Sequence, residues 1–183
     1  MTQYIGIDPG ASGALIVLNS FGEIACHKDF SSNPEDYIAV LDFLKGFKDA
    51  YHYKVAIESV HALPQQSTVA GFTFGKNVGM AQLVATGVST EPVQFVTPMK
   101  WKKFFNLSGK DKTKTDFKHM SVDLARQCWP KYEAFFLYSK DGRAEAALIA
   151  LWYYLTSNNQ SLEDWLEATQ SCEAHVKDKK GGD

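Results

Sequence analysis

The segment from Ala144 to Leu155 constrains the fold most, because it predicts a helix that is apolar on every side except at Glu145. A surface helix keeps one polar face, whereas a helix that is apolar all round is buried. The chain of 183 residues is the size of one domain with a single core. We therefore expect this helix to lie in the core, with Glu145 directed toward a specific partner.

Short runs rich in β-branched residues come before this helix and predict strands. Residues 3–8 and 14–19 are separated by a glycine turn, and a third run ends near Phe30 after a turn at Gly22. Three strands joined by tight turns indicate an antiparallel meander.

Helices and strands then alternate along the rest of the chain. We expect strands at 54–58 and 91–97, and helices starting at Pro34 and spanning 67–86, 115–129, 141–155 and 162–174. The predicted fold class is α/β, a mixed sheet of about five strands that begins with the meander and is flanked by helices. The sequence shows no internal repeat and no second domain.

The charge of the chain is low overall but unevenly distributed. A net charge of −2 argues against a protein that coats nucleic acid by charge alone. Seven lysines nevertheless gather in one stretch, against two aspartates: Lys100, Lys102, Lys103, Lys110, Lys112, Lys114 and Lys118. This stretch indicates a localised contact with a polyanion; a solvated lysine-rich loop and helix face is the alternative.

Three features predict a cytoplasmic protein without a membrane segment. The N-terminus has no signal-peptide pattern, and no apolar stretch reaches the roughly 18 residues that a membrane span needs. The three cysteines, Cys26, Cys128 and Cys172, are far apart and form no CxxC pair. That pattern argues against structural zinc and suits a reducing compartment.

Two carboxylates end apolar strands. Asp8 follows Tyr4-Ile5-Gly6-Ile7 and precedes a glycine turn, and Glu58 follows Val55-Ala56-Ile57. A buried charge in either place needs a cation or hydrogen-bond donors. If the two strands are neighbours, the like charges require a cation between them or a protonated partner. The alternative for Asp8 is that it only caps its own turn.

A second acidic pair opens the buried helix. Asp141 and Glu145 are four residues apart and therefore share one helix face. The alternatives are a helix cap for Asp141 and a favourable dipole interaction for Glu145. Oxygen ligands without a His or Cys cluster suit Mg²⁺ or Mn²⁺.

Taken in order, these motifs resemble the RuvC-type Holliday junction resolvases of the ribonuclease H-like superfamily. The segments that carry the resemblance are Ile5-Gly6-Ile7-Asp8-Pro9-Gly10, Ile57-Glu58 and Gly142-Arg143-Ala144-Glu145-Ala146-Ala147-Leu148-Ile149-Ala150. Phe72-Thr73-Phe74-Gly75 and Val96-Thr97-Pro98 are similar to the phage and prophage branch. The similarity spans residues 3 to 155. With the elements expected above, this gives a nuclease domain at 1–158, followed by a C-terminal helix at 159–176 and a tail at 177–183 whose composition predicts disorder.

The resemblance also implies an activity. Members act as homodimers that nick two strands of like polarity symmetrically in a four-way DNA junction, in a bacterial cell or a phage-infected host. Two Mg²⁺ ions, with Mn²⁺ as a substitute, would support in-line hydrolysis. Asp8 would bridge both ions, Glu58 and Glu145 would each bind one, and Asp141 would be a ligand or would position water. The bacterial enzymes more usually carry aspartates three apart on the last helix, which leaves the division of labour between Asp141 and Glu145 open.

Further residues are predicted to contact DNA. Lys114 resembles a family lysine near the scissile phosphate, and Lys100 resembles a second one. His61 matches the position of an aromatic residue that stacks at the crossover; a surface loop histidine is the alternative. The remaining predicted contacts are Phe72, Phe74, Lys102, Lys103, Lys110 and Lys112.

Gly71, Gly75 and Gly79 form a stripe on the helix predicted at 67–86. Each interior glycine costs about 1 kcal/mol relative to alanine, so the stripe suggests that another backbone comes close. The candidates are a dimer partner, the DNA or the sheet of the same chain. Phe72 and Phe74 would then contact unpaired bases, with a buried core role as the alternative for at least one of them.

Other functions are compatible with parts of the pattern. An actin-like ATPase or sugar kinase also ends its first strand in Asp and a glycine turn, but needs a duplicated domain and a longer chain. A non-catalytic DNA-binding module would have no use for four carboxylates. Within nucleases, other branched DNA or an RNA–DNA hybrid remains an alternative substrate.

Overall fold

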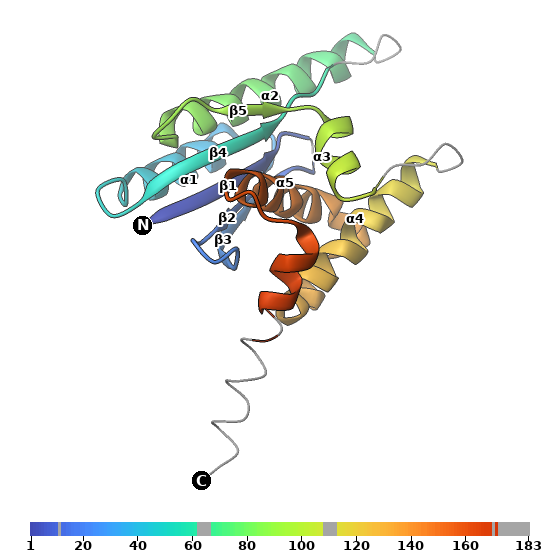
Figure 1. Cartoon of the computed structure of the whole chain (residues 1–183). Coiled ribbons are helices and arrows are strands. Elements are labelled where there is room, and N and C mark those ends of the chain that lie inside the picture. Colours follow the sequence, from blue (N-terminus) through green and yellow to red (C-terminus); the bar gives the residue numbers. More distant parts are fainter. Residues whose placement is uncertain (11, 62–66, 108–112, 170, 172–183) are drawn as a thin grey trace.

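A five-stranded mixed sheet forms the centre of the protein, with helices on both faces (Figure 1). The structure is a computed structural model, and it describes residues 1–10, 12–61, 67–107, 113–169 and 171, without the side chain of Lys114. The strands are β1 (Thr2–Asp8), β2 (Ala14–Leu18), β3 (Ile24–Asp29), β4 (His52–Glu58) and β5 (Gln94–Val96). Their order in the sheet is β3-β2-β1-β4-β5.

Strand directions follow from the connections. β1, β2 and β3 pair antiparallel, as the predicted meander requires, while β4 lies parallel to β1 and β5 parallel to β4. Parallel neighbours need a crossover connection, and the helix after β3 provides it. The α/β class, the meander and the five strands were therefore predicted correctly.

The helices are α1 (Pro34–Lys45), α2 (Thr68–Val88), α3 (Pro98–Phe104), α4 (Lys114–Cys128) and α5 (Asp141–Ser157). Two short 3₁₀ segments, η1 (Pro130–Phe135) and η2 (Tyr138–Lys140), connect α4 to α5. Residues 162–169 are also helical, within the segment predicted as a C-terminal helix. Helix α3 was not predicted, because it is short and directly follows the strand expected at 91–97, without an apolar pattern of helical spacing.

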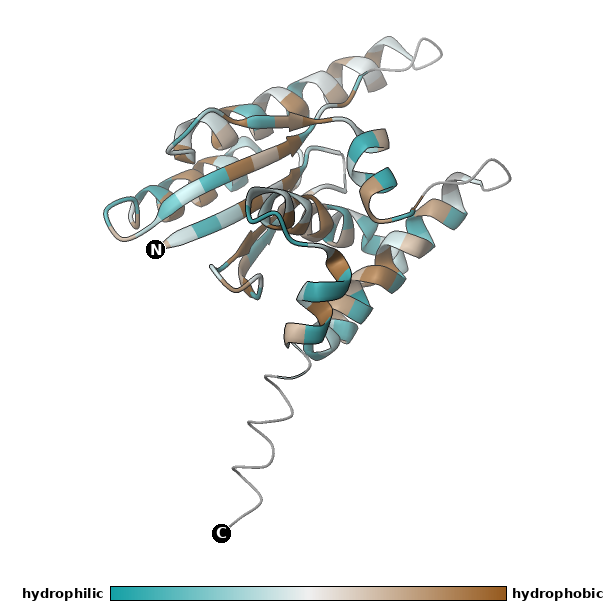
Figure 2. Ribbon diagram, viewed as in Figure 1, coloured by the Kyte–Doolittle hydropathy of each residue, from teal (hydrophilic) through white to brown (hydrophobic). Residues whose placement is uncertain are grey.

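Two hydrophobic clusters fill the two faces of the sheet. Alternate side chains of a strand point to opposite faces, so Ile5 and Ile7 pack with α1 and α2 while Tyr4 packs with α5. Figure 2 shows the apolar residues concentrated in the strands and in α5. From Ala144 to Leu155 all residues of α5 except Tyr153 and Tyr154 are buried, as its sequence predicts.

Glycine allows α5 to lie directly on β1. A Cβ atom at Gly6 would be 2.1 Å from the backbone oxygen of Ala146 and 2.4 Å from the backbone nitrogen of Ala150. Gly142 is equally close to the turn after β1, since its Cβ would be 2.2 Å from the backbone oxygen of Ser12. These approaches bring the first turn of α5 to the C-terminal end of β1.

No helix in the described ranges combines the length and the apolar character that crossing a membrane requires.

Candidate active site

Asp8 and Glu58 lie side by side at one edge of the sheet. Their strands are parallel neighbours with Ile7 opposite Ile57, so the two carboxylates follow each other in register. Parallel strands place their carboxyl ends at one edge, which is where open α/β sheets bind ligands. This arrangement confirms the predicted neighbourhood of the two strands.

Asp8 caps its own turn and also faces helix α5. One carboxylate oxygen, Oδ1, accepts a hydrogen bond of 3.0 Å from the backbone N–H of Gly10 and so caps the turn. The other, Oδ2, would lie 3.0 Å from a Cβ atom at Gly142. The carboxylate therefore faces the first turn of α5.

Asp141 and Glu145 come from that first turn. Lys140 occupies the cap position and Asp141 is the first residue of the helix, without a side-chain capping bond. The interpretation of Asp141 as a helix cap is therefore wrong. With Asp8 and Glu58, the pair makes up all the buried carboxylates in the described part of the chain, each with 7 to 9% of its surface exposed.

Burial and mutual repulsion change how these groups titrate. Burial raises the pKa of Asp8 well above its ordinary value, and the nearby charges of Glu145, Glu58 and Asp141 raise it further, against one hydrogen bond from Gly10. Burial and the charge of Glu145 raise the pKa of Glu58 to about 7, against the opposing effects of Trp101 and Lys102. The four carboxylates from three elements thus form one electrostatic cluster, called the acidic cluster below.

Two lysines and one tryptophan contact the acidic cluster. Lys102 Nζ donates to Glu145 Oε1 at 2.7 Å, and Lys118 Nζ lies 2.8 Å from Asp141 Oδ2. Trp101 Nε1 donates to Glu58 Oε1 at 2.8 Å. Because Trp101 and Lys102 belong to α3 and Lys118 to α4, these two helices close the side of the cluster that the sheet leaves open.

The donor set of the acidic cluster fits a hard divalent cation. Two lysines face four buried carboxylates, so Asp8 and Glu58 have no cationic partner within the described residues. Carboxylate oxygens are the ligands that Mg²⁺ prefers. In the described ranges, however, no three His, Cys, Asp or Glu side chains already have the arrangement of a metal site. The carboxylates of the cluster are therefore suitable ligands for a divalent metal ion, but in this structure they do not have the arrangement of a metal site.

The predicted DNA-contacting lysines separate into groups. Lys102 reaches the acidic cluster, whereas Lys100 Nζ lies 5.2 Å from the ring centre of Trp152 and so turns away from the carboxylates. Lys103 lines the same surface hollow as Lys100. Lys110, Lys112 and the side chain of Lys114 lie outside the described residues.

The aromatic and histidine contacts were predicted on α2 and on the loop before it. His61 is exposed, which leaves both interpretations of it open. Phe72 is 76% exposed and Phe74 is half-buried, so neither belongs to the core. A Cβ atom at Gly71, Gly75 or Gly79 would meet nothing within 4 Å, which excludes the sheet of the same chain as the reason for this glycine stripe.

Sequence reasoning did not single out Trp101 or Lys118 as site residues. Trp101 gives no local signal, because a tryptophan in a short segment reads as core, and it is indeed fully buried. Lys118 follows Lys114, which was predicted as a site residue, by four residues, and in a helix this spacing predicts one shared face. That spacing was the available signal.

No family model and no curated protein sequence matches the chain. Solved structures do match. A RuvC from Thermus thermophilus in complex with a Holliday junction substrate aligns over 85% of this chain and 95% of its own, with a TM-score of 0.56 and 19% identity. Another structure of Thermus thermophilus RuvC aligns over 86% and 97%, with a TM-score of 0.54 and 19% identity. The fold is therefore ribonuclease H-like and matches that of RuvC.

Proposed function

We propose that this protein is a metal-dependent endonuclease that cleaves branched DNA and resolves four-way junctions by paired nicks. The observation that carries the proposal is the acidic cluster, which is buried, short of positive charge and built at the carboxyl ends of neighbouring parallel strands. A structural protein gains nothing from four buried carboxylates, since each is costly to desolvate. The fold match to a RuvC bound to a Holliday junction supports branched DNA as the substrate.

Asp8, Glu58, Asp141 and Glu145 would hold two Mg²⁺ ions. When bound, these ions would activate a water molecule and stabilise the leaving oxygen of an in-line displacement. Asp8 is suited to a shared position, because it is flanked by Glu58 on β4 and by α5. Glu58 and Glu145 are suited to the two outer positions.

The lysines of α3 and α4 would serve the phosphate. Lys102 and Lys118 neutralise part of the acidic cluster in the free protein. With bound metal compensating the carboxylates, the ammonium groups of Lys102 and Lys118 would be available to a DNA phosphate beside the cluster. Lys114, one turn before Lys118 in the sequence of α4, would lie near the scissile phosphate.

A homodimer would supply the two symmetric nicks, because a two-fold protein matches a two-fold junction. The glycine stripe and the exposed Phe72 support α2 as its contact surface, since both are uncovered within the chain. Small residues let two helices approach closely, and an exposed aromatic beside them adds apolar area.

The test is cleavage of a set of substrates by Asp8→Asn and wild-type protein in Mg²⁺. The set contains a four-way junction, a flap, an RNA–DNA hybrid and a linear duplex. Losing a metal ligand removes several kcal/mol of transition-state stabilisation, so we expect a rate about three orders of magnitude lower on the junction. Junction binding in a chelator should persist.

The matched control is Asp42→Asn, which neutralises an exposed carboxylate on α1. It should cut as wild type does. Near-normal cleavage by Asp8→Asn would refute the assignment, and a preference for the hybrid would redirect the substrate to RNA–DNA duplexes.

A further inference from the structure

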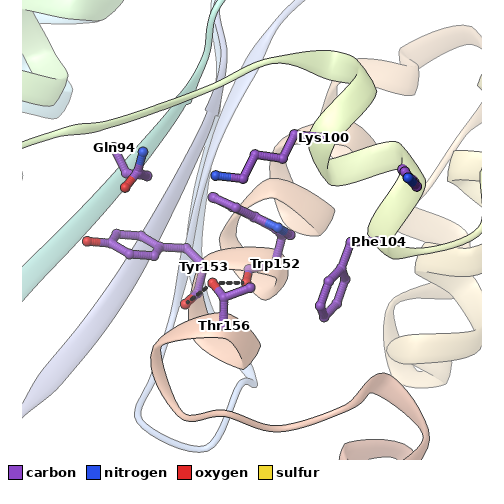
Figure 3. Close-up of a pocket in the computed structure, with 7 residues that line it drawn as sticks. Gln94, Lys100, Phe104, Trp152, Tyr153 and Thr156 are labelled. Atoms are coloured by element: carbon purple, nitrogen blue, oxygen red, sulfur yellow. Dashed lines mark hydrogen bonds between the residues drawn. The ribbon is translucent and has the colours of Figure 1, made fainter.

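A hollow of about 580 Å³ opens between α3 and the second half of α5 (Figure 3). Its size lies in the range of roughly 300 to 1,000 Å³ that is usual for small-ligand sites. Two lysines and three aromatic residues contribute to its lining: Lys100, Lys103, Phe104, Trp152 and Tyr153. No residue of the acidic cluster borders this hollow.

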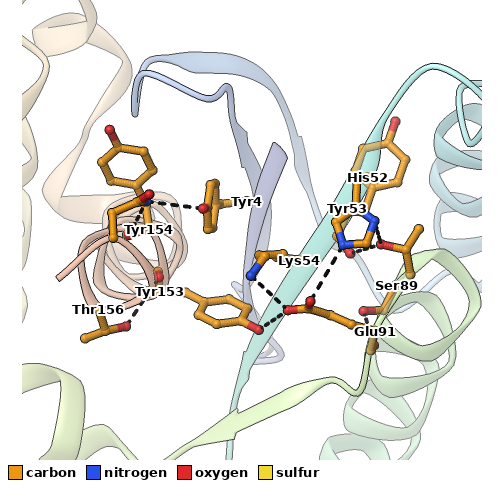
Figure 4. A network of polar contacts seen from close by, with 11 residues as sticks. Tyr4, His52, Tyr53, Lys54, Ser89, Glu91, Tyr153, Tyr154 and Thr156 are labelled. Atoms are coloured by element: carbon orange, nitrogen blue, oxygen red, sulfur yellow. Dashed lines mark hydrogen bonds and ion pairs between the residues drawn. The ribbon is translucent and has the colours of Figure 1, made fainter. Parts of the chain in front are cut away.

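The hollow carries positive charge. No carboxylate lines it, and within the described ranges neither Lys100 nor Lys103 forms an ion pair. Tyr153 is hydrogen-bonded to one acidic group, Glu91, whose Oε1 lies 3.5 Å from Lys54 Nζ (Figure 4). Since Lys54 compensates Glu91, the two lysines of the hollow are left for an external anion.

Its walls are aromatic and fixed. The ammonium group of Lys100 lies over the ring of Trp152, and the hydroxyl of Tyr153 donates to Glu91 Oε1 at 2.6 Å, as Figures 3 and 4 show. Phe104 stands on the α3 side with 36% of its surface exposed. A ligand that fits both the positive charge and the aromatic walls is an anion that carries a flat ring. A nucleotide has both of these properties.

Helix α3 connects the hollow to the acidic cluster. Within its seven residues Trp101 and Lys102 contact Glu58 and Glu145, while Lys100, Lys103 and Phe104 line the hollow. A DNA strand with one phosphate at the carboxylates can therefore continue over α3 and place a nearby nucleotide in the hollow.

We infer that this hollow binds an unpaired nucleotide of the DNA substrate, with its phosphate at Lys100 and Lys103 and its base stacked against Phe104. The inference rests on the proposed function for its substrate. In a duplex the faces of the bases are covered by their neighbours, so only an unpaired base can stack on a side chain. The substrate class is thereby narrowed to branched DNA with unpaired nucleotides near the point of cleavage.

The first test locates the base directly. The full chain is irradiated in a chelator with a 15-nucleotide strand that carries a single 5-iodouracil among thymines, and cross-linked peptides are sequenced. Cross-links to Phe104, Trp152 or Tyr153 are the expected result. Cross-links found only elsewhere would overturn the inference.

The second test measures binding of the same strand without metal as salt is varied. The double variant Lys100→Ala/Lys103→Ala should lower the salt slope by about 0.7, the value for one lost phosphate contact of a single strand, because both lysines are placed at the same phosphate. Its control is Lys45→Ala/Lys48→Ala, which removes two exposed lysines at the end of α1 and should leave the slope unchanged. Equal slopes for the two double variants would overturn the phosphate contact.

Phe104→Leu tests stacking, because it keeps an apolar side chain and removes the ring. Binding of the single strand should weaken roughly five-fold or more, and binding of a duplex of the same length should not change. An equal loss on both would overturn the preference for an unpaired base.

None of the three tests depends on catalysis, so the two proposals fail separately. If all variants of the hollow bind as wild type does while cleavage still depends on Asp8, the nucleotide-binding proposal is refuted and the nuclease proposal stands. If cross-links form at the hollow but the protein cleaves no substrate, the nucleotide-binding proposal stands and the nuclease proposal is refuted.

Discussion

Gly6 sets the distance between the sheet and the helix that carries half of the acidic cluster. Gly6→Ala would drive a methyl group into the backbone of α5, which cannot yield as a flexible side chain does. We expect a loss of about 3 kcal/mol or more in the free energy of unfolding. Urea denaturation measures it.

The control for this change is Gly71→Ala on α2, where the added methyl meets nothing. Replacing an interior helical glycine in open space should raise stability by up to about 1 kcal/mol. Opposite signs for the two variants are the expected result, and a tolerated Gly6→Ala contradicts the close approach of α5.

Glu145 and Asp141 differ in how centrally they lie in the acidic cluster. The charge of Glu145 raises the pKa of both Asp8 and Glu58, whereas of these two carboxylates Asp141 affects only Asp8, and there as the smallest of the causes. We therefore expect Glu145→Gln to reduce junction cleavage about tenfold more than Asp141→Asn, a difference of about 1.4 kcal/mol. Single-turnover cleavage rates of the two variants at saturating DNA measure this difference. A slower rate for Asp141→Asn than for Glu145→Gln would make Asp141 the more important of the two residues.

At the scale of elements, one ion pair ties α5 to the edge of the sheet. Arg143 Nε and Nη2 donate to the two carboxylate oxygens of Asp29 at 2.7 Å each, and Lys140 adds a contact of 3.2 Å. Asp29 ends β3 and Arg143 lies between the two carboxylates of α5. The pair therefore holds the first turn of α5 in place.

The pH dependence of stability tests this tie. The hydrogen bonds from Arg143, and to a smaller extent from Lys140, lower the pKa of Asp29 below its ordinary value of 3.8. A lowered pKa means that the stabilisation is complete above about pH 4 and disappears as the carboxylate is protonated at lower pH. At pH 7 we expect Asp29→Asn to lose about 1 kcal/mol, a small value because Asp29 is one-third exposed.

Melting temperatures of wild type and Asp29→Asn should thus differ by about 2–4 °C at pH 7 and converge toward pH 2. Asp42→Asn, at an exposed site, should follow wild type throughout. A difference that stays constant down to pH 2 would show that the charge of Asp29 contributes nothing.

Elements differ in how far their sequences predict them. Helix α5 and strands β1 and β4 have apolar patterns that leave few alternatives, so their carboxylates were found as well. Helix α3 has seven residues, three of them lysines, and its one buried anchor is Trp101. Its role comes from tertiary contacts, namely Trp101 with Glu58 and Lys102 with Glu145, which no local pattern encodes.

At the scale of the whole molecule, the glycine stripe tests the proposed dimer. Gly75→Leu adds bulk where the chain itself offers no contact, so the folded monomer should keep its melting temperature. If α2 pairs with a second copy, this variant should sediment as a monomer and lose paired nicking of a junction. Gly46→Leu, near the end of α1, serves as the control of equal size and should remain dimeric.

A wild-type protein that stays monomeric at micromolar concentration, both free and on a junction, would contradict the dimer. The meander and the five strands of the sheet could be predicted from the sequence, but this surface could not. A stripe of small residues looks the same whether it faces the sheet, a partner or DNA.

The order in which the acidic cluster is assembled has a consequence for synthesis. Asp8 and Glu58 leave the ribosome early, but Asp141 and Glu145 follow more than eighty residues later. Until α5 emerges, one face of the sheet lacks its cover and exposes Ile16 and Leu18, which α5 buries in the finished protein. The growing chain is therefore a client for chaperones until α5 covers this face, and the acidic cluster is complete only once α5 has been synthesised.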